Sequence, residues 1–419
     1  MRQMKDSRIE WIGSIPNYWT LQPLRGHLEE IREINNPIQT TQVLSLTNKL
    51  GVVPYEEKGE QGNKSKENYN EYKLAYPNTI VANSMNILIG SVGICNYFGC
   101  VSPVYYVFQP KQQEELKFLD YIFQSQPFQK ELRRYAKGIL EIRLRVSSND
   151  ILRRQVAFPP LAEQKKIVDF LETKLAQVDE LIANQQAQIE KLKEYKQSII
   201  TEAVTKGLDK SAPMKDSGIE WIGKIPVHWE IRKIKYLFEE SSARNEELSY
   251  ELLSFSGTRG LIRFSDHTDK LPSAEDLSNY KIIHKGQLCM NRMQAWQGMF
   301  IDANIVGCVS PDYAVYIPFE NANVRYYAYL FRTPGFVQQF ANLSKGIGTG
   351  FNRLYTPAFF QVEASCPSKI EQDKIVDYLN DKFCKIDRLI AIKQQKIEKL
   401  QEYKKSLIYE YVTGKREVV

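Results

Sequence analysis

The sequence has few of the residues that build metal centres, and it has no long apolar run. Its 419 residues include six cysteines and four histidines. No two cysteines have the CxxC spacing, which argues against a zinc cluster and favours free thiols in a reducing compartment. No run of about 18 apolar residues is present, and the opening MRQMKDSRIEW lacks the apolar core of a secretory signal. We therefore expect a cytoplasmic protein that binds no metal and enters no membrane.

The sequence also lacks the motifs of nucleotide hydrolysis and methyl transfer. A phosphate-binding GxxxxGK[ST] loop is absent, because Gly223-Lys224 precedes Ile and Gly414-Lys415 precedes Arg. The only Pro-Pro pair stands in Phe158-Pro159-Pro160-Leu161, which is not the [NDS]PP[YF] motif of amino-methyltransferases. Gly346-Ile347-Gly348-Thr349-Gly350 follows an expected helix and so lacks the strand-turn-helix setting of a dinucleotide site. We expect no catalytic residue and no cofactor bound by this chain.

What the chain does contain is an internal duplication with an offset of about 208 residues. DSRIEWIGSIPNYW at Asp6–Trp19 returns as DSGIEWIGKIPVHW at Asp216–Trp229, and GCVSP at Gly99–Pro103 returns at Gly307–Pro311. The sequence IEKLxEYK also occurs twice, at residues 189–196 and 397–404. Two copies of this length indicate duplicated domains rather than a solenoid.

Two long segments without proline or glycine, 161–206 and 369–413, have the spacing of a heptad seam. A helix of about 45 residues would be roughly 65 Å long, longer than a domain of about 160 residues is wide. Packing of each stripe on its own domain is the alternative, but two matched helices in one chain favour an antiparallel coiled coil, with Gln185 and Lys393 near its middle. The predicted seam residues are Leu171, Leu175, Val178, Ile182, Ile189, Leu192, Leu379, Phe383, Ile386, Ile390, Ile397 and Leu400.

The regions before the two long helices mix short apolar runs with turn signals, as mixed α/β (α+β) domains do. Strands are expected at 41–46, 79–82, 104–108, 252–255, 287–290 and 314–317, and helices broken by Pro127 and Pro334 at 118–134 and 324–340. The expected domains are 1–158, a helix at 159–207, 208–366 and a second helix at 367–419. Hydrophobic content of 43% and charged content of 25% are ordinary for such a chain.

This order of elements closely resembles the specificity (S) subunit of type I restriction-modification systems, the HsdS family. The resemblance covers essentially the whole chain. It rests on the two IEWIGxIPxxW openings, on Glu163-Gln164 and Glu371-Gln372 after Pro160 and Pro367, and on the two EKLxEYK helices.

The resemblance implies a bacterial or archaeal protein that does no chemistry itself. Two target-recognition domains would read a split site in double-stranded DNA, and the paired helices would set the gap and dock two methyltransferase subunits. S-adenosylmethionine would belong to those subunits. ATP, Mg and cleavage would belong to restriction (motor) subunits of the full complex.

Candidate DNA-binding residues follow from the chemistry of phosphates and base edges, and the net charge of +6 permits such a partner. Loops opened by Lys137-Gly138 and Lys345-Gly346 end in cations, and polar turns follow two expected strands. Solvated surface charge and drift between the copies are the alternative interpretations. The candidates are Asn83, Ser84, Asn86, Lys137, Arg143, Arg145, Arg292, Gln294, Lys345 and Arg353.

Two other functions remain possible on the sequence. A duplicated coiled-coil scaffold could bind proteins without reading any DNA sequence, and DNA-binding assays distinguish that function from a DNA reader. A stand-alone DNA enzyme is disfavoured by the missing motifs. The tryptophans of the repeated openings, which could stack on bases, are expected to pack in the core instead; they are Trp11, Trp19, Trp221 and Trp229.

Overall fold

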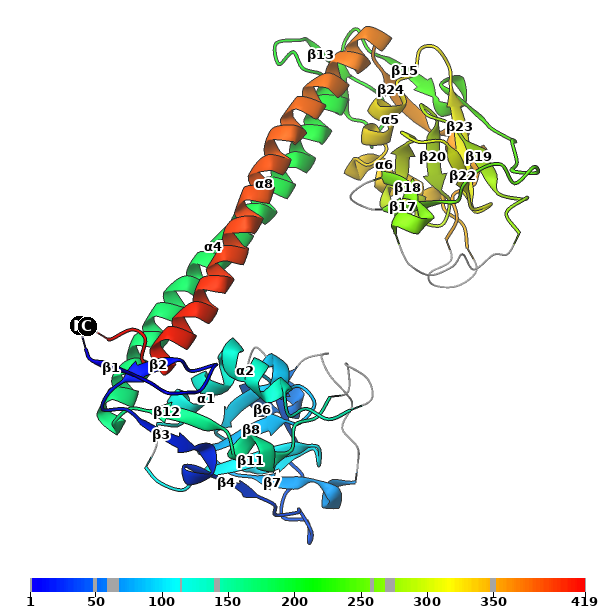
Figure 1. Ribbon diagram of the computed structural model, residues 1–419. Coiled ribbons are helices and arrows are strands. Elements are labelled where there is room, and N and C mark those ends of the chain that lie inside the picture. The colour runs from blue at the N-terminus through cyan, green and yellow to red at the C-terminus, as the bar shows by residue number, and fades with distance from the viewer. Residues whose placement is uncertain are drawn as a thin grey trace. The chain divides into compact units, whose positions relative to one another are not determined.

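A computed structural model of the chain divides into two compact units (Figure 1). Unit 1 comprises Met1–Gln186 and Gln394–Val419, and unit 2 comprises Ala187–Lys393. Each unit therefore combines one duplicated domain with parts of both long helices. The structure describes residues 2–47, 51–58, 68–113, 115–138, 144–256, 260–267, 276–346 and 352–418.

The two long helices, α4 (Leu161–Lys206) and α8 (Lys369–Val412), contribute to both units. Their bounds confirm the two long helices predicted from the sequence. The remaining elements of unit 1 are short. Its strands are β1 (Met4–Asp6), β2 (Ser14–Pro16), β3 (Thr20–Pro23), β4 (Leu28–Ile31), β5 (Leu44–Thr47), β6 (Gly51–Pro54), β7 (Lys73–Ala75), β8 (Thr79–Asn83), β9 (Val92–Cys95), β10 (Gly99–Val101), β11 (Tyr105–Pro110) and β12 (Gln155–Phe158), and its other helices are η1 (Leu24–Gly26), η2 (Tyr55–Lys58), η3 (Tyr69–Glu71), η4 (Ile87–Ile89), α1 (Leu116–Gln124), α2 (Gln126–Arg133) and α3 (Ser148–Leu152).

Unit 2 repeats this order of elements. The predicted break at Pro334 is confirmed, because that residue is the first of a new helix, as Pro127 stands in the first turn of α2. The strands of unit 2 are β13 (Met214–Asp216), β14 (Lys224–Pro226), β15 (Glu230–Lys233), β16 (Phe238–Glu240), β17 (Leu253–Ser256), β18 (Gly260–Arg263), β19 (Lys281–Ile283), β20 (Leu288–Asn291), β21 (Phe300–Asp302), β22 (Gly307–Val309), β23 (Tyr313–Pro318) and β24 (Glu363–Cys366), and its other helices are η6 (Ile234–Tyr236), η7 (Phe264–Asp266), η8 (Ala295–Gln297), α5 (Val324–Leu330), α6 (Pro334–Leu343) and α7 (Thr356–Gln361).

Each unit is organised around a four-stranded antiparallel sheet, in the order β4-β11-β8-β9 in unit 1 and β16-β23-β20-β21 in unit 2. Side chains alternate between the two faces of a strand. In β8, Ile80 and Ala82 pack in the core shared with α1, whereas Val81 packs in a second core on the other face. Because both faces are covered, the central strand is apolar almost without interruption, which made it recognisable in the sequence.

The repeated IEWIG openings form the turns between β1 and β2 and between β13 and β14. Gly13 and Gly223 have φ values of +68° and +69°, a conformation that favours glycine and explains its repetition. Trp19 and Trp229 are completely buried, which confirms their expected place in the core.

Within each unit, α4 and α8 run antiparallel. In unit 1, Asp179 pairs with Lys404 at 2.5 Å, and the rings of Phe170 and Tyr411 lie 4.6 Å apart. In unit 2, Lys196 pairs with Asp387 at 2.8 Å. The predicted seam residues are buried or partly buried. The buried ones are Leu171, Leu175, Val178, Ile189, Leu379, Phe383, Ile386 and Ile397, and the partly buried ones are Ile182, Leu192, Ile390 and Leu400.

Candidate nucleic-acid interface

A short polar turn follows the central strand of each sheet. After β8, the Asn83 side-chain oxygen accepts a hydrogen bond from the Met85 backbone N–H at 3.0 Å. After β20, Asn291 and Met293 make the same bond at the same distance. Such a bond reverses the chain within two residues. It leaves the next polar residue of each turn, Asn86 or Gln294, exposed to solvent.

The two cationic loops are closed by matching pairs of backbone hydrogen bonds. Lys137 and Arg145 exchange N–H···O bonds of 2.8 and 2.9 Å, and Lys345 and Arg353 exchange bonds of 3.0 and 2.8 Å. The structure thus holds the ends of both loops together. Residues 139–143 and 347–351 lie outside the described residues, and the candidate Arg143 is among them.

Each loop also joins the polar turn of its own unit. The Val146 N–H donates to the Ser84 carbonyl at 3.4 Å in unit 1, and the Leu354 N–H donates to the Arg292 carbonyl at 3.0 Å in unit 2. Residues 62 positions apart in sequence therefore meet in the same way in both units. The structure brings the two predicted groups of site residues together in each unit.

The cations of this surface in unit 1 are exposed. Lys137 and Arg145 form no ion pair with an acidic group of the described residues. The Arg145 guanidinium lies 3.8 Å from the Met85 sulfur. Asn83 and Ser84 are buried, with 7% and 3% of their surface exposed. Their burial favours a structural role for these two candidates, and Asn86 is left as the exposed polar residue of the turn.

Two of the three cations of this surface in unit 2 are compensated. Arg292 pairs with Glu240 at 2.7 Å, and Arg353 pairs with Asp312 at 3.1 Å. Lys345 is exposed. A cation that already has a carboxylate partner must exchange that partner to bind an anionic ligand, so the two units present different electrostatic surfaces.

Beneath each surface lies an ion pair that sequence reasoning missed. Glu30 and Lys73 lie 3.8 Å apart, and their duplicates Glu240 and Lys281 lie 3.3 Å apart. Burial lowers the pKa of both lysines, an effect that the neighbouring carboxylates oppose. The glutamate and the lysine of this pair each stand at equivalent positions in the two copies. An alignment of the two copies that looked for repeated charged residues would have found them.

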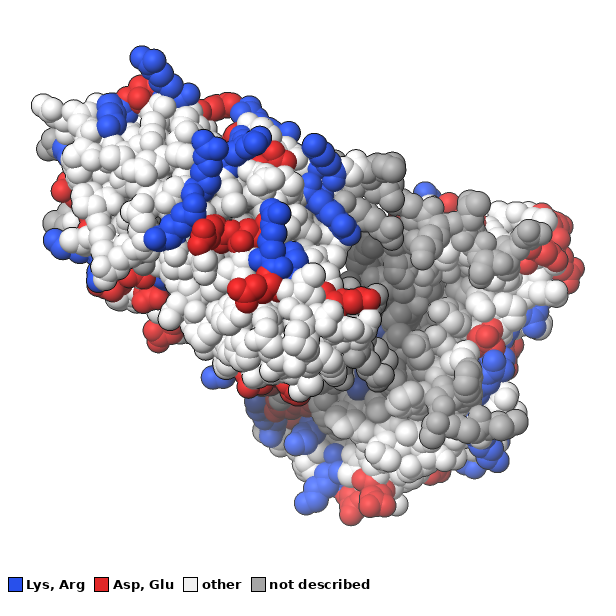
Figure 2. Space-filling view, turned by 90° about the horizontal axis from the view of Figure 1, so that it is seen from below, with Lys and Arg blue, Asp and Glu red and all other residues white. Residues whose placement is uncertain are grey.

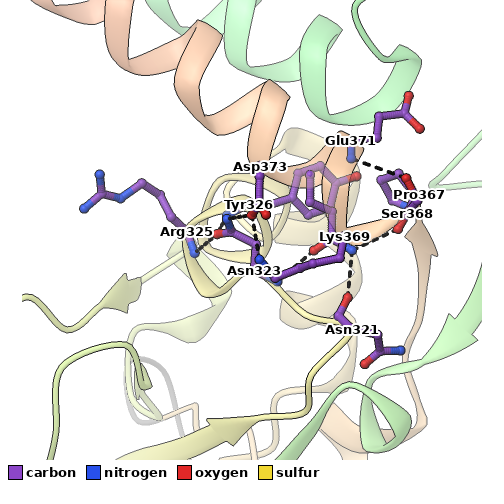
Figure 3. Close-up of polar contacts among 10 residues, drawn as sticks. Asn321, Asn323, Arg325, Tyr326, Pro367, Ser368, Lys369, Glu371 and Asp373 are labelled. Carbon is purple, nitrogen blue, oxygen red and sulfur yellow. Dashed lines mark hydrogen bonds and ion pairs between the residues drawn. The ribbon is translucent and has the colours of Figure 1, made fainter.

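The Pro-x-x-x-Glu-Gln motif, which begins at Pro159 and at Pro367, fixes the start of each long helix on its domain. The Gln372 amide nitrogen donates to the carbonyls of Asn321 and Pro367, both at 2.9 Å, and its oxygen accepts from the Asn323 N–H at 2.7 Å. Figure 3 shows Asn323 and Asp373 side by side at this junction, where the Asn323 side chain also donates to Asp373 at 2.6 Å.

Unit 1 has the same arrangement with longer bonds. Gln164 donates to the Pro159 carbonyl at 3.1 Å and accepts from the Glu115 N–H at 3.3 Å. Gln164 and Gln372 are 4% and 0% exposed. A buried side-chain amide that bridges a helix start to a neighbouring helix fixes the angle between them, because each lost bond leaves a buried polar group unpaired.

The preceding glutamates differ between the units. Glu163 accepts hydrogen bonds from the Tyr18 hydroxyl and the Trp19 indole, both at 3.2 Å, and pairs with Arg2 at 2.9 Å. Glu371 instead contacts His228 at 3.0 Å. The repeated motif therefore keeps its glutamine contacts more faithfully than its glutamate contacts.

Seven large apolar side chains of the long helices are exposed, and four of them stand at duplicated positions. Leu181 and Tyr403 in unit 1 are 46% and 45% exposed, and Leu389 and Tyr195 in unit 2 are 48% and 55% exposed. Asp179 of α4 pairs with Lys404 of α8. Leu181 lies two residues after Asp179 and Tyr403 lies one residue before Lys404, so Leu181 and Tyr403 lie at one level of the antiparallel pair. Leu389 and Tyr195 have the same relation to Asp387 and Lys196. These two pairs are called the Leu-Tyr patches below.

The wider surface carries charges of both signs. On the face shown in Figure 2, Lys and Arg side chains are interspersed with Asp and Glu. Within the described ranges, no group of three or more His, Cys, Asp or Glu residues is placed to hold a metal ion. No helix in the described part of the chain is long and apolar enough to cross a membrane.

The fold and this surface define a class: a duplicated two-domain protein in which each domain presents a polar turn and a cationic loop beside paired long helices. Residues 26–191 match the family described as the type I restriction modification DNA specificity domain. Over this segment the chain is similar to the type I specificity subunits.

Individual relatives are distant. The MjaVIII specificity subunit of a type I restriction enzyme from Methanocaldococcus jannaschii is 24% identical over 277 residues, which are 62% of this chain and 62% of that protein. The chain thus matches less than two thirds of this relative. A chain from a type I restriction-modification assembly is 15% identical with a TM-score of 0.66, covering 95% of this chain and 98% of that one. The HsdS subunit of Thermoanaerobacter tengcongensis is 14% identical with a TM-score of 0.51, covering 98% of this chain and all of that one. These two solved structures share the fold with this chain.

Proposed function

We propose that this chain is the non-catalytic specificity subunit of a type I restriction-modification complex and reads a bipartite site in double-stranded DNA. The observation that carries the proposal is the duplicated surface on which a polar turn and a cationic loop are bonded together at the same place in both units. The frame is repeated, whereas its exposed side chains differ. Two different half-sites require this combination.

Within this surface, the exposed residues divide by chemistry. Lys137, Arg145 and Lys345 are suited to phosphates or to guanine edges, and Asn86 and Gln294 are suited to the edge of adenine. Arg353 and Arg292 would reach DNA only by leaving Asp312 and Glu240. The first half-site would therefore be bound by free cations and the second through an exchange of ion pairs.

The chemistry is assigned to partner subunits because this chain lacks the motifs for it. Methyl transfer from S-adenosylmethionine would be carried out by methyltransferase subunits. ATP-driven cleavage would be carried out by restriction subunits recruited through them. We propose that the complex acts in the cytoplasm of a bacterial or archaeal cell, where its DNA substrate lies.

The Leu-Tyr patches are the proposed anchors for two methyltransferase subunits. Tyrosine is enriched at the centres of protein interfaces, and an exposed leucine beside it extends the apolar patch. One patch occurs in each unit at duplicated positions, so the two patches can bind two copies of one partner. On this basis we propose a stoichiometry of two partners per chain.

The proposal is tested by reconstituting the full chain with its methyltransferase partner and measuring competition between duplexes. A complex that reads sequence will stay bound to its own site in an excess of unrelated duplex at roughly 150–200 mM salt. Its affinity for that site should exceed its affinity for the unrelated duplex by on the order of 10³-fold or more. A complex that binds every duplex alike, with affinity lost steeply as salt rises, would instead indicate the scaffold function.

A further inference from the structure

Unit 1 contains a groove of about 720 Å³ between its recognition domain and the long helices. One wall is α2, which contributes Gln126, Gln129, Lys130 and Arg133, and the other is α8, which contributes Gln401, Lys404, Lys405 and Ile408. In both walls the residues have the spacing i, i+3, i+4 and i+7, which places them on one face of a helix. The groove is therefore formed by two helix faces.

The floor of the groove is apolar and its rim is cationic. Leu88, Ile89 and Leu175 line it together with Ile408, and Ile89 is 66% exposed. Four Lys and Arg residues line it and no Asp or Glu does. Lys404 already pairs with Asp179, but Lys130 and Lys405 pair with no acidic group of the described residues.

We infer that this groove binds an acidic amphipathic helix of a partner protein. A helix fits between two helix faces by placing its side chains in the grooves between theirs. Its apolar side would cover Ile89 and Leu88, and its carboxylates would meet Lys130 and Lys405. A DNA backbone could use the cations but would leave the apolar floor exposed, so a protein helix is the occupant that satisfies both features.

The groove distinguishes unit 1 from unit 2. At the positions that correspond to Lys130, Arg133 and Lys405, unit 2 has Gln338, Ala341 and Gln197. Three cations do occur at other corresponding positions, but Arg332 donates to the Phe300 carbonyl, Lys193 pairs with Glu190, and Lys196 pairs with Asp387. The partner helix is thus expected to bind unit 1 only. The two copies of the partner would then make different contacts with this chain.

The inference rests on the proposed function only for the source of the helix, which is the methyltransferase partner. The test places a benzophenone amino acid at Ile89 of the full chain, in the complex reconstituted with that partner and a duplex. The matched control places it at Gln297, the corresponding exposed position of unit 2. We expect adducts at position 89 with a partner segment that is helical and rich in Asp and Glu, and yields at least about fivefold lower at position 297.

A charge series gives a second readout. Lys130→Glu with Lys405→Glu is expected to weaken partner binding roughly tenfold, and the Gln pair at these positions should weaken it less. Gln338→Glu with Gln197→Glu in unit 2 is expected to change it by no more than about twofold. Adducts to DNA at position 89, no protein adduct there, or equal effects in the two units would overturn the inference. Sequence-specific methylation by the wild-type complex, measured in parallel, reports on the proposed function separately.

Discussion

The side-chain oxygen of Gln372 accepts a hydrogen bond from the backbone N–H of Asn323 at 2.7 Å, which bonds the first turn of α8 to the residue that caps α5. Asn323 in turn accepts bonds from the N–H groups of Arg325 and Tyr326 at 2.9 and 3.2 Å. The start of the long helix and the recognition domain are thereby joined into one network in unit 2.

Replacing Gln372 with leucine should destabilise unit 2 by about 2–4 kcal/mol, because three buried polar groups lose their partner. Gln164→Leu is the matched variant in unit 1. Its bonds are longer, so its effect should be smaller. Thermal unfolding of the two variants beside the wild type measures the difference. Equal stabilities of all three proteins would show that these amides do not hold the helices.

Replacing Arg145 with alanine should weaken DNA binding and leave stability and partner assembly unchanged, because no described acidic group pairs with it. If Arg145 meets a phosphate, the slope of log K against log salt should fall by about 1; if it meets a base, binding should weaken by about 1–3 kcal/mol at one position of the site. Arg353→Ala should weaken DNA binding less, because Arg353 already pairs with Asp312 and must leave that partner to bind DNA. Loss of partner assembly by Arg145→Ala would mark the residue as structural.

Arg143→Ala is predicted to behave like Arg145→Ala.

Leu192→Ala and Leu400→Ala should damage the coiled coil before they affect recognition. Both residues are partly buried seam positions in different units, so each change should cost about 1–2 kcal/mol. Tyr403→Ala is the matched surface change on the same helix and should weaken partner binding without loss of stability. Unfolding curves and partner titrations together separate the two effects. A stability loss for Tyr403→Ala equal to that of Leu400→Ala would contradict the assignment.

The Asp373 carboxyl should make the junction of unit 2 sensitive to acid. A hydrogen bond from Lys369 holds its pKa below the ordinary value of 3.8, assisted by Asn323 and opposed by burial. A depressed carboxylate pKa contributes stability above the unfolded pKa, and this is lost as pH falls through the lower folded value. Asp373→Asn should therefore be slightly less stable than the wild type at pH 7, and the difference should disappear below the folded pKa. A difference that stays constant from pH 7 to pH 2 would exclude this origin.

The sequence predicted the long helices, the seam, the duplicated sheets and the proline breaks because each depends on local patterning. A short run of consecutive apolar residues marks a strand such as β8, and three-four spacing marks α4 and α8. The sequence did not show which domain each half of a long helix packs with. That choice depends on contacts between residues far apart in the chain. Arg2, for example, bonds to the carbonyl of Gly414 at 2.9 Å.

The sequence singled out the turns and loops of this candidate surface, but it did not show their electrostatics. The duplication pointed to the turns and loops, and backbone bonding joins them. Side-chain burial was not visible in the sequence, so Asn83 and Ser84 were grouped with exposed residues. Arg292 and Arg353 were grouped with free cations, although they form ion pairs with Glu240 and Asp312. These carboxylates lie 52 and 41 positions away in sequence and are brought together only by folding.

The central claim is that one chain reads two different DNA half-sites. Long-read mapping of N6-methyladenine on DNA modified by the reconstituted complex tests it most directly. The account predicts one motif with two unlike specified parts separated by an unspecified gap of fixed length. A single continuous motif, or methylation without sequence preference, would contradict it.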